Sequence, residues 1–272
     1  MSRGALLFAF NNPKYDYYAM AEYTAKRINH FLNIPVTLVT DESSIPNKPN
    51  YKFDDVICID ADKSNKRSWS KKDTGMWINK GRYHAYELSP YDETLLLDVD
   101  YVVNSNQLLK VFDTIDDFGC HNNVSFLMQP DAEQEMLSRY SYNTLWATVV
   151  GFRKTNRCKQ IFECLEMVQN NYEHYANLHN FISHMFRNDY ALTLAVRIAN
   201  GHVLLPRDTI PWNLLHIGNN TQLVANNKDS YNTEYTVFYD NWKKGKIKKE
   251  YIVIKDLDFH VLNKKLFVEL MS

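Results

Sequence analysis

Two aspartates, Asp98 and Asp100, are the residues in this chain whose type and spacing most directly suggest chemistry. They follow three consecutive leucines within the run Glu93 to Val103. An apolar run of this kind predicts a strand buried on both faces, which emerges from the core at the aspartates. Because side chains alternate along a strand, both carboxylates would share one face, about 6 to 7 Å apart, with Val99 pointing inward. Two hard oxygen ligands at this spacing suit one divalent cation, with phosphate oxygens and water completing its shell.

A simpler interpretation of Asp98 and Asp100 is that they begin a turn, because aspartate is common where strands end. An isolated Asp-x-Asp favours the turn. The Leu-Leu-Leu-Asp-Val-Asp context favours a functional site, since ligands of open α/β sheets bind in the crevice beyond the carboxyl ends of the strands. The other elements of the chain must then position this site.

Three apolar segments before the aspartates predict further strands: Gly4 to Phe10, Pro35 to Thr40, and Phe53 to Ile59. An amphipathic helix is predicted from Tyr15 to Leu32. The loop between the first strand and this helix lacks GxGxxG and GxxxxGK[ST], which argues against a dinucleotide-binding fingerprint and a P-loop.

Polar residues follow each of these strands and predict a nucleotide-recognition rim. Their side chains could accept hydrogen bonds from a base or a ribose hydroxyl, although for any one of them ordinary turn chemistry is the better explanation. The residues assigned to nucleotide binding are Phe8, Asn11, Tyr15 and Asp41.

Basic residues precede the aspartates. The polar stretch from Asp62 to Thr74 is predicted to be a loop, and Gly75 to Leu88 has helical spacing. Lys80 and Arg82 in that helix could contact a diphosphate in the crevice, or could be solvated surface charges.

In the second half, Leu145 to Phe152 predicts a buried strand, and Arg157 to Tyr172 and Phe181 to Ala199 predict helices. Asp189 could cap or stabilise a helix start, or act at the site. Near the C-terminus, His260 and Lys264 have the chemistry of a metal ligand and a diphosphate contact, although a lone histidine is more often structural.

Composition limits the class of protein. With 272 residues, 45% of them hydrophobic, the chain can bury a large core, and its formal charge of −1 gives no overall attraction to polyanions. Its four cysteines have no CxxC or zinc-finger spacing, so buried free thiols and a cytoplasmic location are predicted. No run reaches the length of a membrane span, and the apolar start is too short for a signal peptide.

Taken together, these residues resemble the GT-A fold glycosyltransferases, and in particular the glycogenin and galactosyltransferase-like group that uses nucleotide sugars. The specific match is Ser-Pro-Tyr-Asp-Glu-Thr-Leu-Leu-Leu-Asp-Val-Asp, from Ser89 to Asp100. Weaker matches are Gly4 to Leu32, Trp146 to Phe152, Asn188 to Leu192 and His260 to Lys264. The C-terminal segment departs from the family's HxGxxKPW because it reads His-Val-Leu-Asn-Lys, and His216-Ile217-Gly218 competes for the same role.

The resemblance implies an α/β fold with a Rossmann-like mixed central sheet flanked by helices and a smaller C-terminal acceptor-side region. The whole chain, 1–272, would be one domain, with a nucleotide-sugar half (1–105) and an acceptor-side half (106–272). Asp98, Asp100 and His260 would hold Mn²⁺ or Mg²⁺, Lys264 with Lys80 or Arg82 would contact the diphosphate, and Asp189 would orient the sugar or the acceptor hydroxyl. The donor would be a nucleotide sugar, UDP-sugar by default, and the similarity leans towards retention of configuration.

The acceptor is open. Small size and aromatic richness resemble phage-encoded transferases that glycosylate hydroxymethylated DNA bases, which would place the protein in the host cytoplasm. Lys63 to Lys72 with Trp69, and Lys243 to Lys249 with Trp242, could contact phosphates and stack on bases, although a duplex base would have to be flipped out. A saccharide or glycan acceptor is the alternative.

Two other classes compete with a glycosyltransferase. A sugar nucleotidyltransferase also uses an acidic pair and a metal, but Phe8 to Lys14 does not supply its glycine-rich phosphate loop. A binding protein on a degenerate transferase fold would have lost its metal ligands, whereas both aspartates are present.

Overall fold

The computed structural model describes residues 1–60, 66–68, 74–76, 79–127, 135–139, 141–182, 185–218, 221–227, 229, 231–243 and 246–271. Its centre is a seven-stranded sheet in the order β11-β8-β10-β6-β1-β2-β3. The strands are β1 (Arg3–Phe8), β2 (Val36–Thr40), β3 (Asp55–Cys58), β6 (Glu93–Leu97), β8 (Phe118–His121), β10 (Trp146–Arg153) and β11 (Thr209–Ile210).

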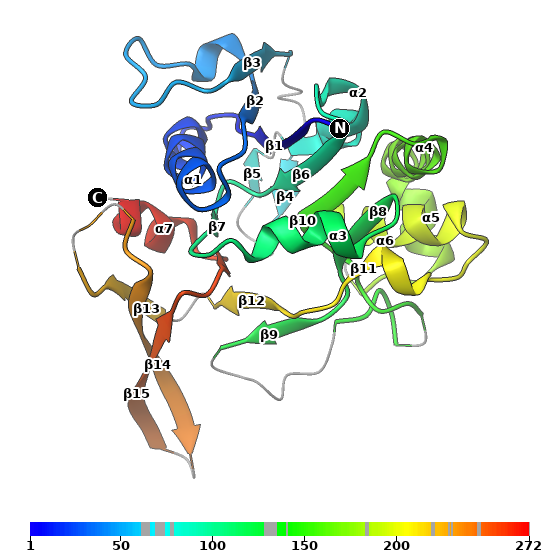
Figure 1. Ribbon diagram of the computed structural model, residues 1–272. Helices are drawn as coiled ribbons and strands as arrows, with labels where there is room; N and C mark the ends of the chain where they lie inside the picture. Colours follow the sequence, from blue (N-terminus) through cyan, green and yellow to red (C-terminus); the bar gives the residue numbers. More distant parts are fainter. Residues whose placement is uncertain are drawn as a thin grey trace.

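The central sheet is mixed because one strand runs against the others. β3, β2, β1 and β6 are parallel neighbours, whereas β10 pairs antiparallel with both β6 and β8, and β11 is parallel to β8. The parallel strands are joined through α1 (Tyr17–Leu32) and the segments that follow it. The prediction of a mixed central sheet flanked by helices is confirmed (Figure 1).

Two hydrophobic cores lie on opposite faces of this sheet. Alternation along the strands sends Leu7 and Leu95 into the core beneath α1, and Leu6 and Leu96 into the other core. That second core is covered by α4 (Asn156–Asn170), α5 (Tyr172–Leu178) and α6 (Asn188–Ala199). The unbroken leucine run therefore follows from burial of both faces of β6.

The helix α1 has defined ends. Asp16 caps its N-terminus by accepting a hydrogen bond from the Ala19 N–H at 2.9 Å. At the other end Asn33 adopts the left-handed conformation, with φ of 51°. These ends define the helix that connects β1 to β2. The two parallel strands therefore finish at the same edge of the sheet.

Two smaller sheets complete the second half of the chain. One has the order β7-β16-β12-β9, formed by β7 (Tyr101–Val102), β9 (Val124–Phe126), β12 (Leu214–Ile217) and β16 (Phe259–Val261). The other is β13-β14-β15, formed by β13 (Thr221–Ala225), β14 (Glu234–Lys243) and β15 (Lys246–Lys255). The β14-β15 hairpin projects from the body of the molecule, and α7 (Lys264–Met271) lies near α1 (Figure 1).

Short elements fill the connections. They are η1 (Glu42–Ser44), η2 (Asn79–His84), α2 (Ala85–Leu88), η3 (Gln107–Lys110), α3 (Val111–Thr114) and η4 (Pro206–Asp208). The stretch predicted as a loop from Asp62 to Thr74 contains β4 (Lys66–Ser68), which pairs with β5 (Thr74–Met76).

Several local predictions need correction. The second helix of the later half begins at Asn188 rather than Phe181. The basic turn around Lys243 to Lys249 is the tip of a hairpin whose strands include most of those residues. All four cysteines are free, but Cys58 is exposed because β3 is the edge strand. Among the described residues, no helix combines the length and the apolar character that crossing a membrane would require.

Candidate metal and diphosphate site

The acidic pair lies in a turn directly after β6 and not in the strand itself. β6 ends at Leu97, and the Tyr101 N–H donates to the Asp98 carbonyl at 3.1 Å, which closes the turn. The prediction that strand alternation aligns the two carboxylates is therefore wrong in its geometry. The turn itself brings Asp98 and Asp100 towards one side, while Val99 is buried.

Three potential ligands converge at this turn. One ligand atom each from Asp98, Asp100 and His260 all lie within 4.8 Å of one another. His260 reaches the turn because β16 pairs with β7, which places His260 opposite Tyr101. Its Nε2 lies 3.1 Å from Asp100 Oδ2. Two carboxylate oxygens and an imidazole nitrogen at this separation fit one divalent cation.

Buried atoms without partners support that fit. Although His260 Nε2 is close to Asp100 Oδ2, the pair lacks hydrogen-bond geometry, and Nε2 has no hydrogen-bond partner among the described residues. A buried polar atom in this condition is costly unless something else binds it. A cation between the imidazole and the carboxylates would satisfy Nε2 without changing the fold.

Two basic side chains neutralise the aspartates. Arg82 Nη1 donates to Asp98 Oδ1, and Lys264 Nζ donates to Asp100 Oδ2. Arg82 comes from η2 and is 5% exposed, whereas Lys264 begins α7 and is 26% exposed. Arg82 Nη2 is buried and has no hydrogen-bond partner among the described residues. The cluster therefore combines cation ligands with donors that suit anionic oxygens.

Two histidines pack together behind the cluster. His216 lies next to His260 in the parallel β12-β16 pair, with its Nε2 3.4 Å from His260 Nδ1. Burial, with smaller contributions from the neighbouring His260, His121 and Arg187, lowers the pKa of His216 to about 2. Burial also lowers the pKa of His260, opposed by the charges of Asp98 and Asp189. Both imidazoles are therefore neutral near pH 7, the state in which histidine binds metals.

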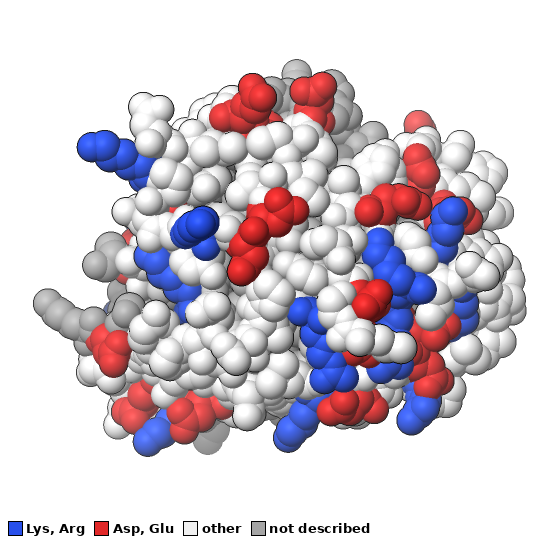
Figure 2. Space-filling view, turned by 45° about the horizontal axis from the view of Figure 1, so that its top comes forward, with Lys and Arg blue, Asp and Glu red and all other residues white. Residues whose placement is uncertain are grey.

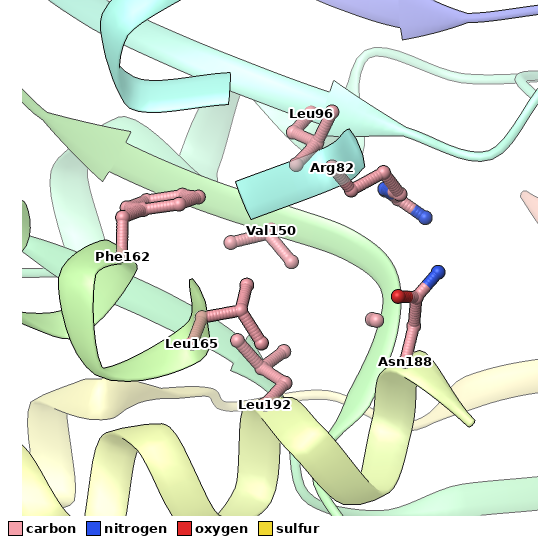
Figure 3. A pocket seen from close by; sticks show the side chains of 8 residues that line it. Arg82, Leu96, Val150, Phe162, Leu165, Asn188 and Leu192 are labelled. Carbon is pink, nitrogen blue, oxygen red and sulfur yellow. The ribbon is translucent and has the colours of Figure 1, made fainter. Parts of the chain in front are cut away.

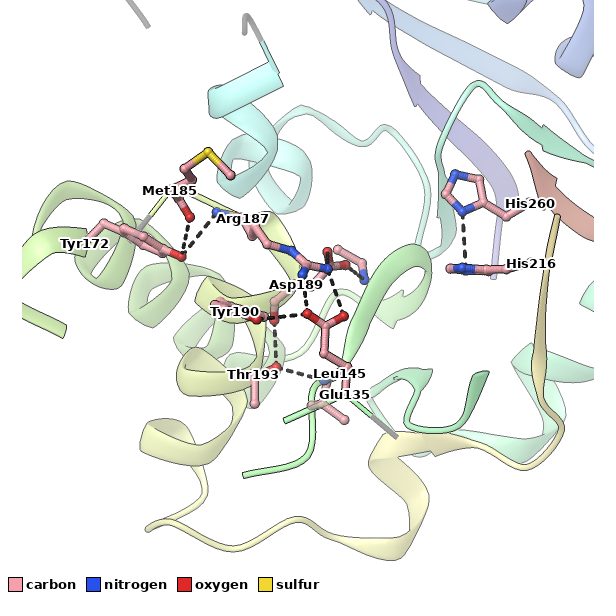
Figure 4. A network of polar contacts seen from close by, with 11 residues as sticks. Glu135, Leu145, Tyr172, Met185, Arg187, Asp189, Tyr190, Thr193, His216 and His260 are labelled. Atoms are coloured by element: carbon pink, nitrogen blue, oxygen red, sulfur yellow. Dashed lines mark hydrogen bonds and ion pairs between the residues drawn. The ribbon is translucent and has the colours of Figure 1, made fainter. Parts of the chain in front are cut away.

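Asp189 lies in the first turn of α6 and belongs to a polar network beside the cluster (Figure 4). Its Oδ1 accepts from the Ala147 N–H at 2.9 Å, and its Oδ2 accepts from Arg187 Nη2 at 3.2 Å. Arg187 also binds both oxygens of Glu135, and the Tyr190 hydroxyl donates to Glu135 at 2.9 Å. Burial, followed by the charge of Glu135, raises the pKa of Tyr190 to about 12, so this hydroxyl remains a donor.

The residues of the predicted nucleotide rim lie at the ends of β1 and β2. The register pairs Leu7 with Leu97, so β1 ends at Phe8 beside the turn that carries Asp98. Asn11 donates its backbone N–H to Ser44 Oγ at 2.7 Å, and Ser43 Oγ donates to Asp41 at 3.0 Å. Asn11 and Asp41 are thus brought together at η1. Tyr15 is half-buried and lies under Lys14, whose Nζ is 5.2 Å from its ring centre.

Some assigned residues cannot be placed in the site. Lys80 belongs to η2, but its side chain lies outside the described part of the structure. The side chains of Lys63 to Lys72 are outside it as well, as are those of Trp242, Lys243, Lys244 and Lys246. In the second basic segment the structure describes Lys248 and Lys249, which are exposed on β15.

A small pocket adjoins the cluster (Figure 3). Arg82 and Asn188 face one another at its polar end, and its wall is apolar. The apolar lining consists of Leu96, Ala147, Val150, Phe162, Leu165 and Leu192. Arg82 therefore connects this pocket to Asp98.

Sequence reasoning missed Glu135 and Arg187, and it considered His216 as a competitor of His260 rather than as its neighbour. Arg187 stands two residues before Asp189, which is a signal that could have suggested an ion pair. Glu135 is 52 residues from Arg187 in the sequence, so nothing local indicates that contact. His216 and His260 are 44 residues apart and meet only because β12 and β16 pair.

Comparisons with known proteins give distant structural similarities. No family model matches the sequence, and no curated protein matches it. The galactosyltransferase LgtC, solved in complex with donor and acceptor sugar analogues, is 14% identical over 71% of this chain and 70% of that chain, with a TM-score of 0.47. Mouse xyloside xylosyltransferase 1 is 11% identical over 75% of this chain and 84% of that chain, with a TM-score of 0.44.

A longer protein also resembles part of this fold. The glycosyltransferase GlyE of Streptococcus pneumoniae TIGR4 is 12% identical over 78% of this chain, with a TM-score of 0.42. The match covers 46% of that protein, so the chain spans less than half the length of GlyE. At such TM-scores function has to be argued from the residues of the site.

Proposed function

We propose that this protein is a metal-dependent glycosyltransferase of the GT-A type that takes a sugar from a nucleotide diphosphate sugar. The observation that carries the proposal is the convergence of Asp98, Asp100 and His260 with Arg82 and Lys264 at one turn. Cation ligands and anion-binding donors at one crevice edge suit a diphosphate and its metal. The resemblance of Ser89 to Asp100 to these transferases supports the same class.

The residues of the cluster would divide the work of binding the donor. Asp98, Asp100 and His260 would hold Mn²⁺ or Mg²⁺, which supplies Lewis-acid stabilisation of the negative charge on a leaving nucleoside diphosphate. Arg82 and Lys264 now bind carboxylate oxygens, and diphosphate oxygens offer them the same charge and geometry. Lys80 is a further candidate for the diphosphate.

Asp189 would orient a hydroxyl of the sugar or of the acceptor. Its two oxygens are held by the Ala147 N–H and by Arg187, so its orientation is fixed before any substrate binds. Each carboxylate oxygen has a further lone pair that could accept from a hydroxyl. Asn188 and Arg82, at the polar end of the pocket, would contact the same sugar.

The nucleotide would lie along the edge where β1 and β2 end. Phe8, Asn11, Tyr15 and Asp41 are the residues proposed to contact it, with uridine as the default base by resemblance. Both halves of the chain would contribute to one domain, because His260 and Lys264 come from the C-terminal half and Asp98 from the N-terminal half.

Two acceptors are proposed for test: a saccharide, and a hydroxymethylated base in DNA. On the face shown in Figure 2, Lys and Arg side chains are interspersed with Asp and Glu and do not form one continuous basic surface. Lys248 is itself 3.5 Å from Glu250. This face supports the saccharide, whereas Lys249 beside the exposed Tyr251 on β15 would suit a nucleic acid.

The test is release of nucleoside diphosphate from a panel of nucleotide sugars with Mn²⁺, run with and without hydroxymethylcytosine-containing DNA and repeated in EDTA. Release that needs metal and modified DNA would identify a DNA glycosyltransferase. Metal-dependent release that is indifferent to DNA would direct the search to saccharides, or, with free sugar as product, to hydrolysis. No release from any donor would contradict the proposal and favour a nucleotidyltransferase or a binding protein.

A further inference from the structure

His216 is a buried histidine whose side chain makes a polar contact with His260. Its side chain is fully buried, and the ring is packed edge-on against Trp146 and Phe126, with centroids 4.7 and 5.4 Å away. Its Nδ1 has no hydrogen-bond partner among the described residues, while its Nε2 lies 3.4 Å from His260 Nδ1. Among the described residues, the polar partner of the His216 ring is therefore His260.

The contact between the two rings fixes how protons are shared. A neutral imidazole carries one N–H, so at each ring one nitrogen donates and the other accepts. Either His260 Nδ1 donates to His216 Nε2, or His216 Nε2 donates to His260 Nδ1. The first arrangement leaves a lone pair on His260 Nε2, and the second places a proton there.

The surroundings of His260 Nε2 favour the lone pair. A proton on Nε2 should make a hydrogen bond with Asp100 Oδ2 at 3.1 Å, but the pair lacks that geometry. The Nε2–H would then be a buried donor without a partner in the described part of the chain. In the first arrangement the donor left without a described partner is instead the Nδ1–H of His216, and His260 Nε2 stays available to a cation. A lone pair on Nε2 would instead be available to a cation, because one ligand atom of His260 and one carboxylate oxygen each of Asp98 and Asp100 lie within 4.8 Å of one another.

We propose that His216 is a positioning residue for His260: its Nε2 accepts the Nδ1–H of His260 and so holds the His260 Nε2 lone pair towards the cation. The presence of a cation rests on the proposed function, whereas the orientation of His260 rests on the geometry of the two rings. Outer partners of metal-bound histidines generally act in this way, and the usual partner is a carboxylate, a carbonyl or water. Here a second imidazole in an apolar setting takes that place.

His121 provides a matched control. It is also fully buried, lies on β8, and has no hydrogen-bond partner for either nitrogen among the described residues. It belongs to none of the groups assigned to the cation or the donor. Replacing His121 therefore tests the effect of losing a buried imidazole near the site without losing the contact with His260.

The experiment reads the tautomer directly. In metal-free wild-type protein labelled with ¹⁵N-histidine, long-range ¹H–¹⁵N NMR spectra at pH 7.5 should show His260 protonated at Nδ1. In His216→Leu the Nε2–H form should appear, whereas His216→Gln, which keeps an acceptor, should retain the Nδ1–H form. His121→Leu should leave the His260 tautomer unchanged.

Calorimetric titration with Mn²⁺ gives the second readout. His216→Leu should bind Mn²⁺ about 10- to 100-fold more weakly than wild type, as is typical when an outer partner is lost. His216→Gln should recover most of the affinity, and His121→Leu should match wild type.

The two readouts separate the possible failures. An Nε2–H tautomer in the wild-type protein would overturn the proposal, even if His216→Leu does not fold. So would Mn²⁺ binding by folded His216→Leu with wild-type affinity. No Mn²⁺ binding by wild type would instead overturn the proposed function, and the wild-type NMR spectrum would still decide the orientation of His260.

Discussion

Two charged groups, one around Arg187 and one around Asp98 and Asp100, differ in how their side chains are paired. Around Arg187, both terminal nitrogens are bound by carboxylates and both oxygens of Asp189 have donors. The Nε of Arg187 is buried and has no hydrogen-bond partner among the described residues. Around Asp98 and Asp100, in contrast, buried nitrogens of Arg82 and His260 have no hydrogen-bond partner among the described residues. A group whose carboxylates are held by paired donors maintains the shape of its surroundings. Unpaired nitrogens that lie beside three converging potential cation ligands mark a place for a ligand. The comparison assigns stability to the ion pairs of Arg187, which also hold Asp189 in place, and binding to the group around Asp98 and Asp100.

The largest expected effect is on activity, from Asp100→Asn. Loss of a charged ligand should lower turnover by at least about 10²-fold, the scale of losing one key electrostatic contact in a transition state. Folding should change little, because the amide oxygen introduced by this substitution can still accept a hydrogen bond from Lys264. Turnover in Mn²⁺ and melting temperature in EDTA would be measured beside Asp113→Asn, an exposed carboxylate. Full activity in Asp100→Asn would remove the distinction between the two groups.

At Arg187 we expect a substitution to lower stability, in contrast to the loss of activity with little change in folding expected for Asp100→Asn. Arg187→Met leaves Glu135 and Asp189 without their shared cation, so the free energy of unfolding should fall by about 3 kcal/mol, as for a broken buried pair. Urea denaturation would measure it, with Arg207→Met as the control because its pair with Asp116 is exposed and should be worth under about 1 kcal/mol. Equal stability of the two variants would show that the network does not hold the fold.

The buried His121, which lies outside both groups, makes a prediction about the pH dependence of stability. Burial lowers the pKa of His121 to about 3, from an ordinary 6.5. Its contribution to stability is therefore fully present above pH 6.5 and is lost as the pH falls towards 3. The loss amounts to about 1.4 kcal/mol at pH 5.5. Urea denaturation at pH 7.5 and 5.5 should show a smaller loss for His121→Gln than for wild type. The exposed His174→Gln should keep the wild-type loss; a wild-type loss in His121→Gln as well would contradict the prediction.

The smallest expected effect concerns Lys264, which would compete with the cation for Asp100 and would also contact the diphosphate of the donor. Without donor, its ammonium competes with a cation for Asp100, so Lys264→Met should bind Mn²⁺ about two- to fivefold more tightly, as expected for a partly exposed ion pair. The same variant should bind a nucleoside diphosphate more weakly. Titration calorimetry would measure both, with Lys265→Met, 79% exposed, as control. Weaker Mn²⁺ binding by Lys264→Met would argue against this competition.

The two regions also differ in how well the sequence predicts them. The leucine run, the acidic pair and the strand ends at Asn11 and Asp41 are local patterns, and the structure has strands at or near the predicted positions. The sequence predicts the turn at Asp98 only as an alternative to a strand end, because the two have the same local composition. The site is completed by contacts between residues that are far apart in the sequence, and strand pairing sets these contacts. Lys264 and Asp100, for example, are 164 residues apart.

The Arg187 network shows the same limit more strongly. Asp189 could be singled out at a helix start, but its fixed orientation depends on the Ala147 N–H, 42 residues away, and on Glu135 through Arg187. No periodicity or spacing in the sequence encodes these contacts. They follow from packing α6 against β10, which is decided by the whole second core.

The most direct test of the central claim is calorimetric binding of UDP to the protein in Mn²⁺ and in EDTA. If Asp98, Asp100 and His260 hold the cation that receives the diphosphate, UDP should bind one site per chain in Mn²⁺ and lose most of its affinity in EDTA. Asp100→Asn in Mn²⁺ should then behave like wild type in EDTA. UDP binding of equal affinity with and without Mn²⁺, or no UDP binding in either, would contradict the assignment of this turn as a metal and diphosphate site.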